Sequence, residues 1–229
     1  MQGALGEGVR IHGAGRTDAG VHAFGQVASL HLPPGMEAPH AEKLRREVND
    51  RLPPDVNVLS LVQAPPGFHA RHAAAMRVYR YRIARRRTAF AKPFVWWVRE
   101  RLDEGAMSRA AAALAGRHDF AAFCENAEGH DSTLVEVSFA QLEPAAGGDL
   151  LLFRIGASHF LWKMVRRIVG ALVEVGAGRL EPAALGAALG ARSGDFARFT
   201  APPSGLFLES VLYAGEPEPA PVDPLRPAF

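Results

Sequence analysis

The sequence has only one cysteine, Cys124, and no Cys-x-x-Cys pair. A single cysteine cannot form an internal disulfide, and a zinc site built on paired cysteines is excluded. No stretch approaches the roughly 20 apolar residues of a membrane-spanning helix, and the first residues carry no signal-peptide pattern. These absences predict a soluble, cytoplasmic protein with no membrane association.

Acidic residues are scarce in one segment. From Arg71 to Arg101 there are ten Lys and Arg residues against one acid, Glu100, although the formal net charge of the whole chain is only +2. Such a local excess attracts polyanions, because phosphate contacts supply most of the affinity in nucleic-acid binding. A solvated surface that binds nothing is the alternative.

The composition, with 48% hydrophobic and 22% charged residues, indicates a packed protein rather than a disordered chain. Alternation of apolar residues predicts extended segments at 9–12, 21–32, 56–62, 76–84, 133–142 and 150–155. Helical periodicity predicts helices at 41–52, 103–115, 159–175 and 182–189. Asp103 and Ser158 are expected N-caps, and Gly147-Gly148 is an expected hairpin turn.

This order of elements predicts an α+β fold with two lobes of largely antiparallel β-sheet, packed helices and a basic cleft between the lobes. The N-terminal lobe, residues 1–100, would hold a glycine-rich turn with one aspartate. The C-terminal lobe, residues 101–213, would hold a long arginine-bearing helix. A proline-rich tail is expected at 214–229.

The turn around Asp18 is the most specific local pattern. It is no dinucleotide fingerprint, because Asp18 occupies the third glycine position of GxGxxG, and no Gly-Lys-Ser/Thr follows to make a P-loop. The surrounding glycines permit tight turns and close approach of another backbone, so the turn can present Asp18 to a ligand. The alternative is that Asp18 has only a structural role and caps a turn or a helix.

The periodicity of a predicted strand indicates on which face its tyrosines and arginines lie. In the strand 76–84, Tyr79 and Tyr81 share one face while Arg80 and Arg82 share the other, which predicts an aromatic and a basic surface. Tyr79 could stack on an unpaired base, whereas Tyr81 is better explained as a core residue.

The helix 159–175 has one apolar stripe, and Arg166 falls on its flank beside Trp162. A guanidinium in that position needs a partner, and a carboxylate is the natural one. The positions opposite the stripe are predicted to face solvent; they are Lys163, Arg167 and Glu174.

Several segments, in order along the chain, resemble the TruA-type tRNA pseudouridine synthases. The first is Gly15-Arg16-Thr17-Asp18-Ala19-Gly20-Val21-His22-Ala23, which is similar to the catalytic motif of that family. The later blocks are Phe68-His69-Ala70-Arg71, Tyr79-Arg80-Tyr81-Arg82, Met164-Val165-Arg166-Arg167-Ile168-Val169-Gly170 and Ala201-Pro202-Pro203-Ser204-Gly205-Leu206. Together they span most of the chain.

The resemblance implies an isomerase that converts uridine to pseudouridine in the tRNA anticodon stem-loop, at positions 38, 39 and 40, without a cofactor or a metal. It implies that Asp18 is the nucleophile, that Tyr79 contacts the target base, that Arg16 holds or displaces the base, and that Arg166 pairs with Asp18. It also implies a homodimer whose RNA spans both subunits. Tyr79 is a further candidate for moving the proton at C5 of the base.

The sequence departs from the family in two places. The Tyr-Asp-Gly and Gly-Trp-Gln elements of the family are not found, so its first strand and helix are expected to be missing, which would expose a sheet edge. In addition, the segment 125–135 lacks the basic residues that many relatives carry there.

Two other functions are compatible with the residues alone. One is an RNA-binding protein without catalysis. The other is a hydrolase of a phosphorylated substrate, in which Asp18 is nucleophile or metal ligand. The histidines show no metal-ligand spacing such as HExxH and are expected in loops or interfaces, although His69 and Arg71 could meet phosphates; those considered are His12, His22, His69, His72, His118, His130 and His159.

Overall fold

The computed structural model describes residues 8–129, 131–191 and 195–217. Contacts between Cα atoms divide the chain into two compact units. The smaller unit contains the described residues 8–15 and Val27–Ala73, and the larger contains Arg16–Gln26 and the chain from Ala74 onward. The lobe boundary expected near residue 100 is a different division and stays a prediction. The expected tail lies outside the described residues from position 218 onward.

Among its described residues, the smaller unit contains two strands and one helix. Strand β1 (Arg10–Gly13) pairs antiparallel with β3 (Ala28–His31), and helix α2 (Ala41–Asn49) buries Leu44 and Val48. The helix ends three residues before the predicted Leu52, at Asn49, whose side chain binds the backbone of the segment that follows. Its Oδ1 accepts the N–H of Val58 at 2.7 Å and its Nδ2 donates to the carbonyl of Val58 at 3.0 Å.

The two hydrogen bonds between Asn49 and Val58 also explain why the predicted strand at 56–62 is wrong. The backbone of Val58 is satisfied by a side chain rather than by a neighbouring strand. Three apolar side chains of the segment are exposed, namely Val56, Leu59 and Val62, the last two to 70% and 82%. In the described part of the chain the segment therefore pairs with no strand, although its apolar residues alternate.

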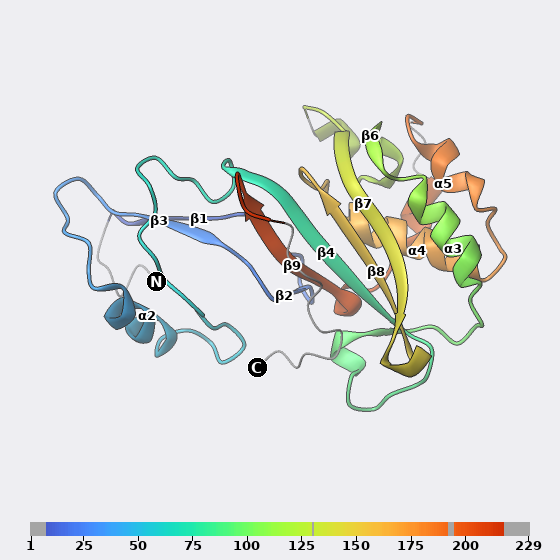
Figure 1. Cartoon of the computed structure of the whole chain (residues 1–229), viewed down its shortest axis with the longest axis horizontal. Coiled ribbons are helices and arrows are strands. Elements are labelled where there is room, and N and C mark those ends of the chain that lie inside the picture. The colour runs from blue at the N-terminus through green and yellow to red at the C-terminus, as the bar shows by residue number, and fades with distance from the viewer. Residues whose placement is uncertain (1–7, 130, 192–194, 218–229) are drawn as a thin grey trace. The chain divides into compact units, whose positions relative to one another are not determined.

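The larger unit is built on one sheet (Figure 1). Within the described residues its order is β2–β9–β4–β8–β7–β6, with β5 paired to β4. The pairs β2–β9 and β4–β5 are parallel and all others are antiparallel. The strands are β2 (His22–Ala23), β4 (Ala74–Ala84), β5 (Trp96–Trp97), β6 (Gly116–Asp119), β7 (Leu134–Ala145), β8 (Leu150–Ala157) and β9 (Leu206–Tyr213).

The α+β class and the largely antiparallel sheet are confirmed. The predicted strands at 76–84, 133–142 and 150–155 are β4, β7 and β8, and the turn at Gly147-Gly148 lies in the short helix η4 (Ala146–Gly148). The sequence interpretation missed β5, β6 and β9. Missing β9 matters most, because it lies between β2 and β4 and so joins the Asp18 segment to the tyrosine strand.

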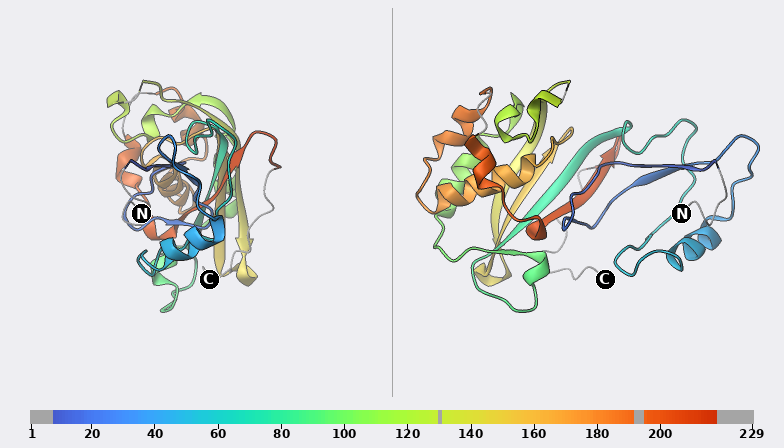
Figure 2. Two further views of the ribbon diagram at one scale, coloured as in Figure 1. Left: turned by 90° about the vertical axis from the view of Figure 1, so that its left-hand side faces the viewer. Right: turned by 180° about the vertical axis from the view of Figure 1, so that it is seen from behind.

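The helices of the larger unit are α3 (Glu104–Ala112), α4 (Met164–Gly176) and α5 (Ala183–Ala188), and they cover one face of the sheet (Figure 2). Asp103 caps α3 as predicted, because its Oδ1 accepts the N–H of Ala106 at 2.9 Å. None of the helices in the described part of the chain is long and apolar enough to cross a membrane. The other short 3₁₀ helices are η1 (Lys92–Phe94), η2 (Ala121–Phe123), η3 (Ala127–Gly129), η5 (Asp195–Phe199) and η6 (Pro203–Gly205).

Helix α4 starts later than predicted. Ser158 is not its N-cap; that position is taken by Lys163, whose φ of 60° is left-handed. The hydroxyl of Ser158 instead lies 3.1 Å from Nδ1 of His159. The segment from Ser158 to Lys163 is therefore an irregular approach to the helix, and it directs side chains differently from a continued helical turn.

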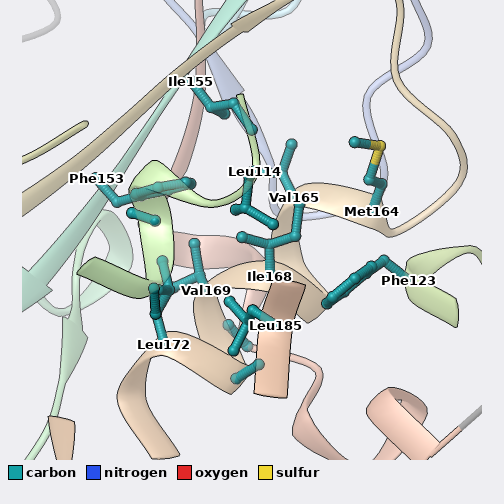
Figure 3. Close-up of a cluster of buried hydrophobic side chains, with 14 of the residues drawn as sticks. Leu114, Phe123, Phe153, Ile155, Met164, Val165, Ile168, Val169, Leu172 and Leu185 are labelled. Atoms are coloured by element: carbon teal, nitrogen blue, oxygen red, sulfur yellow. The ribbon is translucent and has the colours of Figure 1, made fainter. Parts of the chain in front are cut away.

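The core lies between α4 and the sheet (Figure 3). Phe153 and Ile155 of β8 point toward Val165 and Ile168 of α4. The predicted apolar stripe of α4 is buried throughout, which confirms the helical periodicity. Arg167, however, is buried at 5% exposure rather than facing solvent, because its guanidinium donates to the carbonyl of Cys124 and to the carboxylate of Glu125.

The sequence prediction for the opposite face of β4 is also wrong. Arg80 and Arg82 were expected on a basic surface, but they are only 1% and 8% exposed. Glu209 forms one ion pair with Arg80 at 2.9 Å and another with Arg154 at 2.9 Å. The guanidinium carbon of Arg82 lies 4.4 Å from the ring centroid of Phe207. This face of the sheet is therefore a buried ionic layer and not an exposed patch of charge.

Candidate active site

Asp18 lies on a turn that is fixed to the central sheet. The carbonyl of Asp18 accepts the N–H of Val21 at 3.0 Å, which closes the turn. The chain then continues as β2 beside β9, and the N–H of Phe24 donates to the carbonyl of Leu208 at 2.9 Å. The turn is thereby held by backbone hydrogen bonds to β9.

Two glycines make this close approach possible. Gly20 has a left-handed φ of +80°, and a Cβ there would lie 3.1 Å from Cγ of Pro203. A Cβ at Gly25 would lie 2.8 Å from the backbone oxygen of Glu209, a distance that real Cβ atoms essentially never show. The glycine-rich sequence is therefore needed to bring the aspartate segment against β9.

Both oxygens of the Asp18 carboxylate receive a hydrogen bond from the beginning of α4. Arg166 Nη1 lies 3.3 Å from Oδ2 and Trp162 Nε1 donates to Oδ1 at 3.2 Å. Hydrogen bonds to an ionised group are stronger than neutral ones, and two donors on different oxygens restrict rotation of the carboxylate. Asp18 remains 34% exposed while Arg166 is 15% exposed, so the acid is held in place and still open to solvent.

Arg166 is itself anchored by the segment that follows η5. Its Nε donates to the carbonyl of Ala201 at 2.8 Å, and its own carbonyl accepts the N–H of Ala201 at 3.0 Å. One edge of the guanidinium is thus held by the backbone and leaves Nη1 directed at Asp18. The segments Met164–Gly170 and Ala201–Leu206, far apart in sequence, position the same group.

Gly170 allows this approach of α4 and η5. A Cβ at Gly170 would lie 1.3 Å from the carbonyl oxygen of Phe199, two residues before Ala201. No side chain fits there without a shift of backbone. The glycine at the end of the Met164–Gly170 motif is therefore part of the support of Arg166.

Tyr79 lies on the face of β4 that packs against the core, and its ring meets Phe160 edge-on with centroids 5.0 Å apart. Burial raises the pKa of Tyr79 to about 12; Arg77 acts to lower it and the charge of Asp18 acts to raise it further. The phenol is therefore neutral at physiological pH, and it lies within electrostatic range of Asp18.

Tyr81, on the same face, is a core residue as expected. It is fully buried, and its hydroxyl donates to the carbonyl of Pro202 at 2.7 Å. Burial raises the pKa of Tyr81 well above its ordinary value. It therefore supports the Ala201–Leu206 segment and is not available to a ligand.

Arg16 lies two residues before Asp18 and has an exposed side chain. The structure places it on the same segment as the acid, in the larger unit. An exposed arginine at this position can reach a phosphate or a base without disturbing the fold.

The histidines near the Phe68–Arg71 block lie together in the smaller unit. The rings of His69 and His72 are 4.3 Å apart, and His12 is 4.6 Å from His69. Desolvation, followed by the nearby His72, lowers the pKa of His69. The shift disfavours the charged form of His69. In the described part of the chain, no group of three His, Cys, Asp or Glu side chains is suited to hold a metal ion.

Trp162 is the site residue that the sequence interpretation missed. Helical geometry placed it only on the flank of α4 beside Arg166. The available signal was its position four residues before Arg166, which in a helix is the neighbouring position on the same face. Its contact with Asp18 depends on the left-handed turn at Lys163, and this turn has no signature in the sequence.

The fold and the site together define an α+β enzyme with one fixed, accessible carboxylate beside a neutral phenol, an arrangement suited to nucleophilic chemistry. A family profile described as tRNA pseudouridine synthase matches residues 110–214. tRNA pseudouridine synthase A from Moorella thermoacetica is 42% identical over 210 residues, which are 91% of this chain and 83% of that protein.

Two further relatives carry the same name. The protein from Rhodopseudomonas palustris strain CGA009 is 42% identical over 228 residues, covering 93% of this chain and 88% of that protein. The protein from Geobacillus kaustophilus is 37% identical over 213 residues, covering 92% and 81%. The chain therefore belongs to the tRNA pseudouridine synthase family, whose members are isomerases.

Proposed function

We propose that this enzyme converts uridine to pseudouridine in the anticodon stem-loop of tRNA, at positions 38, 39 and 40, with Asp18 as nucleophile. The observation that carries the proposal is the double support of the Asp18 carboxylate by Trp162 and Arg166, at 3.2 Å and 3.3 Å. A nucleophile must be aimed at its target, and two donors on different oxygens fix the orientation of the carboxylate.

The reaction needs no redox partner and no energy source. The bond from C1′ of the ribose to N1 of uracil breaks and a bond from C1′ to C5 forms, while the proton leaves C5 and N1 gains one. Substrate and product contain the same atoms. The protein must therefore supply a positioned carboxylate and hold the detached base while it turns.

The other residues take roles that fit their positions. Tyr79 contacts the target base with a neutral phenol, which suits a hydrogen bond or a proton relay better than a charged group would. Arg166 orients Asp18, and exposed Arg16 holds or displaces the base. Extraction of the base from its stack costs a few kcal/mol, which contacts of this kind offset.

Replacement of Asp18 by Asn tests the proposal. The amide keeps the shape of the side chain and removes the negative charge, so the variant should form no pseudouridine in an unmodified tRNA transcript while its affinity for tRNA stays within about twofold. Asp50→Asn, at an exposed position on the smaller unit, is the matched control and should retain full activity. Product formation by Asp18→Asn at the rate of the parent enzyme would refute the role of Asp18.

The rival functions give different results in the same assay. An RNA-binding protein without catalysis would form no product with either variant or with the parent chain. A metal-dependent hydrolase would lose its activity with EDTA, whereas the proposed isomerisation should be indifferent to chelation. Mapping pseudouridine in transcripts that keep only one uridine at position 38, 39 or 40 tests the site specificity.

We further propose that the enzyme acts as a cytoplasmic homodimer that binds one RNA across both subunits. The support is the family resemblance of the motifs. Light scattering of the full chain with and without tRNA should give the mass of two chains, and a single-chain mass under both conditions would refute the dimer.

A further inference from the structure

A second candidate ligand site lies beside β5 in the larger unit, in a pocket of about 330 Å³. This volume is at the lower end of the range for small-ligand sites, and it suits a single nucleotide-sized group. Its lining includes Arg87, Lys92, Val95, Trp96, Trp97 and Ser204.

The pocket combines cations with aromatic rings. Arg87 and Lys92 contribute positive charge, and no carboxylate is among the described residues that line the pocket. The guanidinium carbon of Arg87 lies 5.5 Å from the ring centroid of Trp97, which is 41% exposed. An exposed indole beside a cation can stack on a nucleobase while the cation meets a phosphate.

The two arginines just before Arg87 do not offer the same chemistry. Arg85 pairs with Glu104 and Arg86 pairs with Asp149 at 2.9 Å, so acids compensate the charges just before Arg87. Another pocket of comparable size is lined by Asp103 and Glu104 as well as by an arginine, and it has no aromatic lining. The pocket at Trp97 is therefore complementary to a nucleotide, whereas the other is not.

The wall of this pocket is continuous with the catalytic segment. The hydroxyl of Ser204 donates to the carbonyl of Val95 at 3.3 Å, and the preceding residue, Pro203, is the one that a Cβ at Gly20 would touch. On the other side, Nε2 of His22 lies 2.9 Å from the carbonyl of Pro93. Both connections join the pocket to residues within four positions of Asp18.

We propose that this pocket binds one nucleotide of the substrate RNA other than the reacting uridine, with its base on Trp97 and its phosphate on Arg87 and Lys92. The proposal rests on the proposed function, because it assumes an RNA substrate. It adds a second contact that holds the RNA while the target base is at Asp18, so it concerns affinity and not the chemical step.

Trp97→Ala tests the stacking contact. Loss of one base–aromatic stack should raise the KM for a tRNA transcript about tenfold and leave kcat within about twofold. Trp97→Phe, which keeps an aromatic ring, should recover most of the affinity. The matched control is Phe90→Ala, since Phe90 is 96% exposed close to Arg87 in sequence and does not line the pocket.

Arg87→Ala tests the phosphate contact independently of any effect of the tryptophan on folding. The slope of log K against log salt concentration should decrease by about 1, because one fewer counterion is released on binding. A slope equal to that of the parent, together with an unchanged KM for Trp97→Ala, would overturn the proposal. A fall in kcat for Trp97→Ala at unchanged KM would also overturn it, because the pocket would then act on chemistry.

Binding measured in the Asp18→Asn background separates the two proposals. If Trp97→Ala weakens the binding of an anticodon stem-loop RNA in that background, the pocket binds RNA whether or not Asp18 is the nucleophile. If RNA affinity is unchanged there while Asp18→Asn abolishes product, the pocket proposal fails and the proposed function stands.

Discussion

Replacement of Gly170 by alanine is expected to disturb both the fold and the Asp18 site. A Cβ at this position would lie 1.3 Å from the carbonyl oxygen of Phe199. Ordinary van der Waals contact begins near 3.4 Å, so the carbonyl would have to withdraw by about 2 Å, which is the difference between 3.4 and 1.3. The obstacle is backbone, and no rotation of a side chain can relieve it.

The expected loss of stability depends on the displacement of this backbone. Overpacking of a core commonly costs about 1–3 kcal/mol, and displacement of backbone places this substitution at about 3 kcal/mol or more. For a protein of this size, such a loss lowers Tm by about 6–12 °C. Ala201 hydrogen-bonds Arg166 in both directions, so the same shift moves the guanidinium away from Asp18. Misplacement by about 1 Å can cost about 100-fold in rate.

Thermal unfolding and pseudouridine formation at a temperature well below Tm should be measured on the same preparation. The control is Gly186→Ala in α5, where a Cβ would lie an ordinary 3.5 Å from Cβ of Ala113. Alanine is favoured over glycine in a helix by about 1 kcal/mol, so the control should be neutral or more stable. If Gly170→Ala unfolds at the parent's temperature and has the parent's kcat, the close contact of α4 with η5 is refuted.

Three further predictions concern other parts of the larger unit. Glu209→Gln removes the buried carboxylate shared by two arginines and should lower the free energy of unfolding in urea by about 3–5 kcal/mol. The control Asp149→Asn breaks an exposed ion pair and should lower it by under about 1 kcal/mol. Equal losses for the two variants would contradict the buried network. The pKa of Tyr79 is about 12 in the folded protein against an ordinary value of 10.0, so the folded state holds that proton more tightly and stability should be lost as pH rises from 10 through 12. Tyr79→Phe should make this alkaline loss shallower in unfolding curves, and an unchanged slope would count against burial of the phenol. Trp162→Phe keeps an aromatic ring but removes the donor to Asp18, so kcat should fall about tenfold with tRNA affinity within twofold; an unchanged kcat would exclude a positioning role.

Features that depend on residues close in sequence were predictable. The cap of α3 by Asp103, the alternation of β4 and the apolar stripe of α4 all agree with the structure, because a cap, a strand face and a helix face are set within a few residues. The unusual glycine content around Asp18 also correctly indicated a close backbone approach.

Features that depend on a distant partner were not predictable. The segment 56–62 alternates like a strand, but the side chain of Asn49 binds the backbone N–H and carbonyl of Val58. Arg167 and Arg80 look like surface charges in sequence and are buried, because Glu125 and Glu209 compensate them. Strand β9 was not predicted, although it lies between β2, which follows the Asp18 turn, and β4, which carries Tyr79.

The sequence by itself determined which side chains could carry the chemistry, an aspartate in a glycine-rich turn and an arginine on the flank of a helix. Only the tertiary structure decided how the aspartate is held, since the indole of Trp162 reaches it through a left-handed residue at position 163. The physical reason is that local periodicity fixes the direction of a side chain relative to its own element, whereas the groups it meets belong to segments far away in the sequence, as with Trp162 and Asp18, which are 144 residues apart.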